Sequence, residues 1–338
     1  MTGPLSGIRV VEFEGIGPAP YTGMLLADLG AEVTRIARPH AARGDLIADT
    51  GDAVMLRGRR SITLDLKAAE DREAAMNLLA DADALIEGLR PGAMEKLGLG
   101  PGEVHGVNPR LVYTRITGWG QEGPLARTAG HDINYIALSG ALALMGPADG
   151  PPLPPANLVG DFGGGGLFAA FGLLAGVLEA RRTGKGSVVD AAMLDGAASQ
   201  MAFLYAWAAT GTWRAGRERN LLDGGAPFYR CYTCACGGHV AVGAIEPQFF
   251  SALMHGLGLQ EEGWEQSDRD TWHHLSARLS EVFATRPRDA WAQHFAETDA
   301  CVTPVLTMWE AADHPHNRAR GTFAGDPVQP APGPRFAG

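Results

Sequence analysis

The stretch Ile8-Arg9-Val10-Val11-Glu12-Phe13 is a short β-rich run, and it ends in the turn-forming residues Gly15-Ile16-Gly17-Pro18. Residues 21–29 then have a helical pattern closed by Gly30, and residues 32–36 form a second β-rich run. This order predicts a βαβ unit, which requires a parallel sheet with covering helices.

The same alternation continues along the chain. Residues 68–79 have the charged outer face of a covering helix, and residues 84–87 and 111–116 have the composition of buried strands. We therefore predict a doubly wound, Rossmann-like α/β sheet over roughly the first 120 residues.

The turn after the first strand does not carry the dinucleotide fingerprint, because Pro20 stands where the third glycine belongs. Arg35 and Arg38 replace the acidic residue expected after the second strand. Arginine at that place suits a ribose phosphate, as in NADP or coenzyme A (CoA). The incomplete fingerprint argues against an NADP-dependent reductase.

The pattern changes in the C-terminal half. Residues 228–233 and 239–245 predict a hairpin, and helical patterns follow at 247–257, 271–283 and 288–298. We predict a smaller α+β domain at 228–308 and a helical linker at 189–227. The large domain is then formed by 1–188 and 309–338, with a tail that wraps an existing surface.

Composition excludes several classes of protein. With 338 residues, 46% hydrophobic residues and 20% charged residues, the chain is typical of a globular protein of two domains. A net charge of −10 argues against nucleic acid as a partner. No continuous apolar run reaches the ~20 residues of a membrane span, and no signal peptide is expected at the start. We expect a cytoplasmic protein without a membrane partner.

Four cysteines in so long a chain do not form a disulfide framework. Cys231, Cys234 and Cys236 with His239 have some resemblance to a zinc site, but they fall in a strand–turn–strand pattern. We favour structural cysteines over metal ligands and predict no metal.

Three other stretches carry candidate acid–base groups. Asp161 lies between an apolar run and four consecutive glycines, where it is either a helix N-cap before a tightly packed segment or a functional carboxylate. His131 and Glu246 also precede helical patterns, and glycine or proline stands close to each. Sequence spacing alone cannot bring the three together.

The chain resembles the family III CoA transferases, and within them the α-methylacyl-CoA racemases, nearly from end to end. The resemblance rests on an ordered series of motifs: Gly3–Gly7, Leu26–Val33, Glu87–Gly92, Thr117–Gln121, Gly130–Tyr135, Asn157–Gly165, Asp223–Pro227, Val242–Gln248 and Asp299–Val305. Each motif is weak alone, and their order makes the resemblance specific. The sequence departs from the family at Gly166, where relatives carry serine, and at the alanine before Arg38.

The resemblance implies an interlocked homodimer with active sites shared between subunits. It implies that His131 and Asp161 are two bases flanking the α-carbon of an acyl-CoA thioester, and that Glu246 of the partner chain orients His131. It also implies that Arg38, Arg57 and Arg90 hold the CoA phosphates and adenine region, with Asp132 among the CoA-binding residues. No further cofactor is implied, because CoA is part of the substrate.

Two bases on opposite faces of a carbon suit inversion of its configuration through an enolate. We therefore expect a 2-methylacyl-CoA racemase. The alternatives are a CoA transferase, in which Asp161 attacks the thioester as nucleophile, and a non-catalytic CoA-binding protein. The acyl chain itself is not specified by the sequence.

Overall fold

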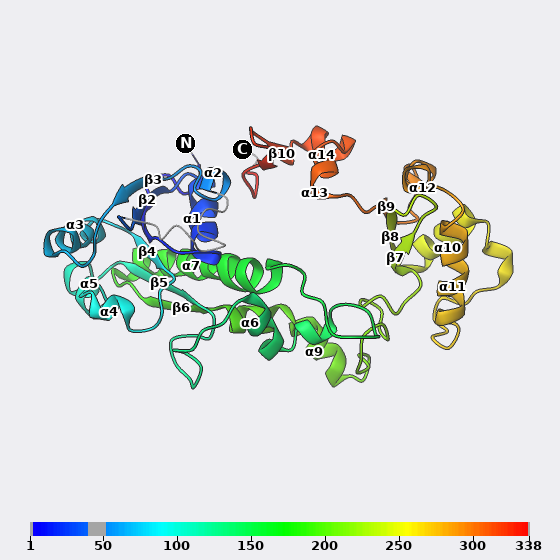
Figure 1. Ribbon diagram of the computed structural model, residues 1–338, viewed down its shortest axis with the longest axis horizontal. Helices are drawn as coiled ribbons and strands as arrows, with labels where there is room; N and C mark the ends of the chain where they lie inside the picture. The colour runs from blue at the N-terminus through cyan, green and yellow to red at the C-terminus, as the bar shows by residue number, and fades with distance from the viewer. Residues whose placement is uncertain (1–2, 40–51, 337–338) are drawn as a thin grey trace. The chain divides into compact units, whose positions relative to one another are not determined.

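The computed structural model describes residues 3–39 and 52–336. These residues form two compact units (Figure 1). The first consists of 1–142, 154–202 and 321–338, and the second of 143–153 and 203–320.

A six-stranded sheet organises the first unit, and all its strands are parallel in the order β3-β2-β1-β4-β5-β6. The strands are β1 (Arg9–Phe13), β2 (Glu32–Ala37), β3 (Arg60–Thr63), β4 (Ala84–Glu87), β5 (Val112–Thr117) and β6 (Val188–Ala192). This is the Rossmann strand order, which reverses between β1 and β4. The predicted Rossmann-like sheet is therefore confirmed.

Helices cover both faces of this sheet (Figure 1). One face is covered by α1 (Pro18–Asp28) and α7 (Phe168–Thr183), and the other by α3 (Ala69–Ala80), α4 (Ala93–Lys96) and α5 (Pro101–Val107). The unit also contains α2 (Asp52–Met55), α6 (Asp132–Ser139) and α8 (Met193–Gln200). Val10 of β1 packs with Ala19 and Leu173, from α1 and α7. Its neighbour Val11 packs on the opposite face with Leu79 of α3. Burial on both faces explains the apolar runs Val10–Val11 of β1 and Ala84–Ile86 of β4.

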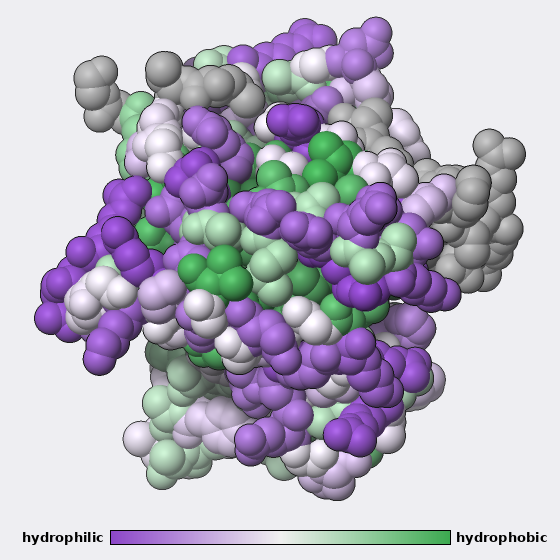
Figure 2. Space-filling model, turned by 90° about the vertical axis from the view of Figure 1, so that its left-hand side faces the viewer, coloured by the Kyte–Doolittle hydropathy of each residue, from purple (hydrophilic) through white to green (hydrophobic). Residues whose placement is uncertain are grey.

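Hydrophilic side chains predominate on the face that Figure 2 shows, and they surround several smaller hydrophobic patches. Such a mixture is normal for a protein surface.

A π-helix, η2 (Leu158–Leu167), leads directly into α7. Its glycines allow close packing, since a Cβ at Gly164 would lie 2.7 Å from the backbone nitrogen of Ala197 in α8. A Cβ at Gly166 would lie 2.5 Å from the Tyr21 ring in α1. The glycine run is therefore explained by packing, as one of the two interpretations of this stretch expected.

Together η2 and α7 form a 26-residue apolar helix, Leu158–Thr183, which is long enough to cross a membrane by length and composition. The expectation that no such segment exists was wrong, because η2 and α7 are continuous. In the structure, Ala169, Leu173 and Val177 of this helix pack in the core against the sheet.

An antiparallel sheet organises the second unit, with the strands β7 (Tyr229–Thr233), β8 (His239–Gly243) and β9 (Val302–Pro304) in that order. The helices of this unit are α9 (Ala202–Ala209), α10 (Pro247–Leu257), α11 (Trp272–Phe283), α12 (Arg288–Phe295), α13 (Met308–Ala311) and α14 (Pro315–Arg320). Tyr232, Val240 and Val302 face one core with Phe250 and Leu279 from α10 and α11. The predicted α+β segment is confirmed, and β9 adds a strand that the sequence did not indicate.

The compact units differ from the sequence-based division. Residues 143–153, 203–227 and 309–320 group with the small sheet. Side chains tie two of these segments together, since Arg217 donates to the carbonyls of Pro147 and Gly150 at 2.7 and 2.5 Å. The tail behaves as expected: β11 (Gln329–Pro330) pairs with β10 (Phe323–Ala324) and accepts hydrogen bonds from Arg57.

Candidate active site

A pocket of about 370 Å³ lies at the carboxyl ends of the central strands of the first unit. Its walls include residues 16–19 after β1, residues 88–91 after β4 and residues 116–119 at the end of β5. The strand order reverses between β1 and β4, and open α/β sheets bind ligands at this switch point. Because His131 and Asp161 also line the pocket, the fold brings together two of the three predicted acid–base residues.

His131 is the N-cap of α6, and its backbone N–H donates to the side chain of Asn134 at 3.1 Å. α6 begins at Asp132, directly after this N-cap, so His131 does precede a helix as the sequence predicted. The exposed imidazole lies beside the first turn of α6, where backbone N–H groups lack intrahelical partners.

Asp161 lies within the π-helix η2, so it is not the N-cap that the alternative interpretation expected. Asn157, one turn earlier, donates from Nδ2 to Asp161 Oδ2 at 3.0 Å. Gly17 allows the carboxylate to approach the turn after β1, because a Cβ there would lie 3.2 Å from Oδ2.

Burial raises the pKa of Asp161, and the nearby Asp132 carboxylate raises it further. The hydrogen bond from Asn157 and the proximity of His131 oppose this shift. A raised pKa brings the carboxyl group closer to the range in which it can both donate and accept a proton near neutral pH.

Asp132 is buried, and its Oδ2 accepts hydrogen bonds from the backbone N–H groups of Gly160 and Asp161 at 2.7 and 2.8 Å. It therefore fixes the beginning of η2 to the beginning of α6, which are the two segments that carry the candidate bases. Within the described part of the chain, its other oxygen has no hydrogen-bond partner. Its assignment to CoA binding stays a prediction.

Tyr135 and Trp119 form an aromatic wall of the pocket, with an edge-to-face ring contact of 4.8 Å. The Tyr135 hydroxyl donates to the carbonyl of Gly130, and burial together with the Asp161 charge raises its pKa to about 12. Gly118 makes room for the ring, because a Cβ there would lie 2.1 Å from it.

Sequence reasoning assigned no role to Tyr135 or Asn157. The helical spacing was an available signal, since each lies four residues from a candidate base and so on the same side of its helix.

The three predicted CoA-binding arginines lie in different surroundings. Arg90 is exposed and lines the pocket. Arg38 is exposed at the carboxyl end of β2, where it forms an ion pair with Glu14 at 3.4 Å. Arg57 instead forms a two-pronged bridge to the buried Asp28, at 2.9 and 2.6 Å, and contacts the C-terminal tail.

Comparison with known proteins agrees with this geometry. The pattern of CoA-transferase family III matches residues 5–335. The chain is 46% identical over 332 residues to "Alpha-methylacyl-CoA racemase" of Mus musculus, covering 98% of this chain and 85% of the relative. The human protein of the same name is 45% identical over 334 residues, covering 98% and 86%. The chain belongs to CoA-transferase family III.

A solved CaiB/BaiF family structure from Brucella suis has the same fold, with a TM-score of 0.83 and 26% identity over 100% of this chain and 93% of that one. The fold predicted from the family resemblance is thus confirmed for each unit.

Glu246, the third predicted acid–base residue of this family III protein, belongs to the second unit. It is the N-cap of α10, and its side chain is exposed. Among the described residues, no group of three or more His, Cys, Asp or Glu side chains is arranged to hold a metal ion.

Proposed function

We propose that this chain is an α-methylacyl-CoA racemase, an isomerase that interconverts the two configurations of 2-methylacyl-CoA thioesters. The pocket that joins His131 to the raised-pKa carboxyl of Asp161 carries the proposal. The names of the 45–46% identical relatives over 98% of the chain support the same reaction.

The reaction needs one group to remove the α-proton and a second group to return a proton to the opposite face. If neutral His131 removes the proton, Asp161 must be protonated, and it becomes a carboxylate when it donates. The reverse reaction starts from that carboxylate and the imidazolium. The raised pKa of Asp161 matters because both of its protonation states must be populated. Such groups typically contribute ~10²–10⁴ to the rate each.

The enolate oxygen formed between the two proton transfers needs hydrogen-bond donors. The backbone N–H groups of Asp132 and Ile133 are in the first turn of α6, directly after His131. The positive end of that helix also favours negative charge. We assign the enolate oxygen to this position, where such donors are worth ~10²–10³ in rate.

Arginine side chains would hold the negatively charged phosphates of CoA. The exposed Arg38–Glu14 pair stabilises the fold little, so Arg38 can turn to a phosphate at small cost. Arg90 at the pocket is the second candidate. Arg57 would first have to leave the buried Asp28, so its predicted phosphate contact is the least favourable of the three.

The finer proposal is a homodimer in which Glu246 of a second copy orients His131, with the protein acting in the cytoplasm. Exposed apolar side chains along the η2–α7 helix support a partner of this kind: Leu167 is 51% exposed, Phe171 73% and Leu178 70%. Co-expression of tagged His131→Ala and Glu246→Ala chains tests it, because a heterodimer would regain one complete site. A verified heterodimer without activity would contradict shared sites.

The proposed reaction is tested by following α-proton exchange of each 2-methylacyl-CoA epimer in deuterium oxide. We expect the native protein to exchange and interconvert both, and His131→Ala and Asp161→Asn to lose interconversion by a factor of ~10²–10⁴. Each variant keeps exchange of only the epimer that its remaining base reaches. Asp195→Asn is the control, since Asp195 is an exposed carboxylate on α8.

Three results would overturn the proposal. No exchange in the native protein, together with acyl transfer to an added carboxylic acid, would indicate a CoA transferase with Asp161 as nucleophile. CoA binding without either reaction would indicate a non-catalytic protein. Loss of exchange of both epimers in only one variant would indicate a single base.

A further inference from the structure

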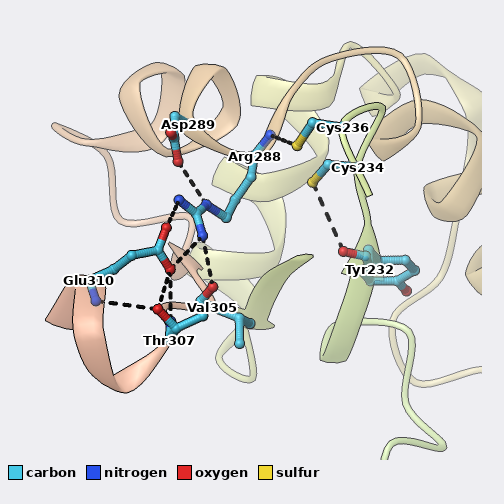
Figure 3. A network of polar contacts seen from close by, with 8 residues as sticks. All are labelled: Tyr232, Cys234, Cys236, Arg288, Asp289, Val305, Thr307 and Glu310. Carbon is cyan, nitrogen blue, oxygen red and sulfur yellow. Dashed lines mark hydrogen bonds and ion pairs between the residues drawn. The ribbon is translucent and has the colours of Figure 1, made fainter. Parts of the chain in front are cut away.

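The loop between β7 and β8 holds two cysteines in one tight turn. The Cys234 N–H donates to the carbonyl of Gly238 at 2.8 Å, and the Gly237 N–H donates to the carbonyl of Cys234 at 2.9 Å. Gly237 has a φ of +78°, which closes a short hairpin loop of this kind. Cys234 and Cys236 therefore lie within one closed turn, as the close-up in Figure 3 shows.

Cys236 is exposed and lies at the beginning of α12 (Figure 3). The backbone N–H of Arg288, the first residue of that helix, donates to Cys236 Sγ at 3.3 Å. This hydrogen bond, a second one from the Gly238 backbone and the Arg288 charge hold the pKa of the Cys236 thiol below its usual value. The thiolate is the nucleophilic form, so Cys236 has the surroundings of a reactive cysteine.

The position of Arg288 is itself fixed. Its guanidinium binds Glu310 at 2.8 Å and Asp289 at 2.7 Å, and it donates to the carbonyl of Val305 at 3.3 Å. These bonds fix Arg288 to its own helix and to residues 305–310, and the Ala235 N–H holds the loop beside α12 by donating to the carbonyl of Arg286 at 3.0 Å. The Arg288 N–H that donates to Cys236 is therefore held in a fixed position.

The other three thiols are different. Cys234 is 3% exposed, and burial raises its pKa. Cys301 is exposed, but partial desolvation and the charges of Glu246 and Asp299 raise its pKa. Cys231 is exposed on β7, opposite Ala241 of β8. Cys236 alone among the four combines exposure with donors to its sulfur, and it has a buried thiol in the same turn.

We propose that Cys236 and Cys234 form a reversible dithiol–disulfide site that reacts with small disulfides of the glutathione type. The Cys236 thiolate attacks one sulfur of the small disulfide, which forms a mixed disulfide and releases one thiolate. Cys234 then loses its proton and attacks the Cys236 sulfur, which forms the intrachain disulfide and releases the second thiolate. One small disulfide is reduced to two thiols, and the two protein thiols are oxidised.

The chain geometry allows this closure. Two residues separated by one other cannot be more than about 7.6 Å apart between Cα atoms, and a turn brings them closer. A disulfide needs about 4.4–6.8 Å. The ring encloses a single residue, so it is strained, and strained disulfides are the easily reduced ones. The site should therefore respond to the thiol–disulfide balance and not act as a permanent crosslink.

The test uses the full chain and oxidised glutathione, followed by alkylation of the remaining thiols and mass spectrometry. Chymotryptic cleavage after Tyr232 separates Cys231 from Cys234 and Cys236. The native chain should lose two hydrogens from the fragment with Cys234 and Cys236, and dithiothreitol should restore them. Cys234→Ser should trap glutathione on Cys236, and Cys236→Ser should leave Cys234 reduced. Cys301→Ser, the control, should behave as the native chain does.

A second measurement isolates the hydrogen bond to the sulfur. Arg288→Pro removes the N–H but keeps a residue that suits the first position of a helix, after Pro287, whose ψ of 154° tolerates a following proline. Arg288→Ala removes the same side chain and keeps the N–H. We expect alkylation of Cys236 at neutral pH to be about three- to tenfold slower in Arg288→Pro than in Arg288→Ala.

Equal modification of Cys231, Cys301 and Cys236 would overturn the proposal, as would glutathione retained on Cys236 in the native chain. Equal alkylation rates of Cys236 in the two Arg288 variants would show that the N-terminus of α12 does not activate this thiol. These readouts do not involve the substrate pocket, so they stand or fall separately from racemase activity.

Discussion

The two sheets of this chain differ in how many of their faces are covered. The parallel sheet has helices on both faces, and its β4 and β5 strands are wholly buried. The antiparallel sheet packs one face on α10 and α11, while Tyr229, Cys231 and Thr303 line an open hollow of about 720 Å³. When helices cover both faces of a sheet, a ligand can reach it only at the ends of the strands. The candidate bases lie at the carboxyl ends. In the small sheet, polar and reactive side chains also lie on a face and in a turn.

The difference between the two units is tested most strongly by one glycine-to-alanine substitution in each of them. A Cβ at Gly196 would lie 2.0 Å from the carbonyl oxygen of Gly164, where η2 packs on α8. A Cβ at Gly243, in the small sheet, meets no heavy atom within 4 Å. We expect Gly196→Ala to lower the free energy of unfolding by ~3 kcal/mol or more and Gly243→Ala to change it by less than ~1 kcal/mol. Denaturant unfolding measures both, and equal losses would contradict the difference in covering.

The next prediction compares two arginines of the first unit, Arg57, which is paired with a buried carboxylate, and Arg38, which is exposed at the end of β2. Arg57→Ala leaves the buried Asp28 carboxylate without its bridge, so we expect a loss of up to ~3 kcal/mol in unfolding free energy. Arg38→Ala removes an exposed ion pair and should cost less than ~0.5 kcal/mol.

Steady-state kinetics completes this pair of variants. We expect Arg38→Ala to raise KM for the acyl-CoA by roughly ten- to hundredfold, because it removes a charge-assisted phosphate contact. An unchanged KM would remove Arg38 from the CoA site. A higher KM for Arg57→Ala without any loss of stability would assign Arg57 to CoA instead.

The smallest predicted effect concerns the hydrogen bond between Asn157 and Asp161 in the pocket. Asn157 donates to Asp161 and so lowers the pKa that burial raises. Without the amide, the Asp161 pKa should rise, and the acidic limb of the kcat/KM profile should move to higher pH. We expect Asn157→Ala to lower kcat about tenfold at neutral pH. Asn157→Asp, which places a second carboxylate there, should move the limb in the same direction. A limb that does not move would show that Asp161 does not titrate in the reaction.

The sequence by itself determined the parallel sheet, because the alternation of β-rich runs with helical patterns leaves few possible topologies. It also predicted the small α+β unit and the resemblance to the family, which the comparisons bear out. His131 and Asp161 were named from motifs whose order is fixed along the chain.

Only the tertiary structure decided what surrounds each of those residues. Asp161 lies in a π-helix, its carboxylate accepts a hydrogen bond from Asn157, and its backbone N–H donates to Asp132. All three features depend on how η2 packs against α6 and α8. Arg57 and Arg38 look alike in the sequence, but the fold places one against a buried carboxylate and the other at an exposed strand end. Likewise, the donor to Cys236 comes from a residue 52 positions later in the chain. Local sequence sets the period and polarity of an element, while burial and hydrogen-bond partners arise from segments that meet only when the chain folds.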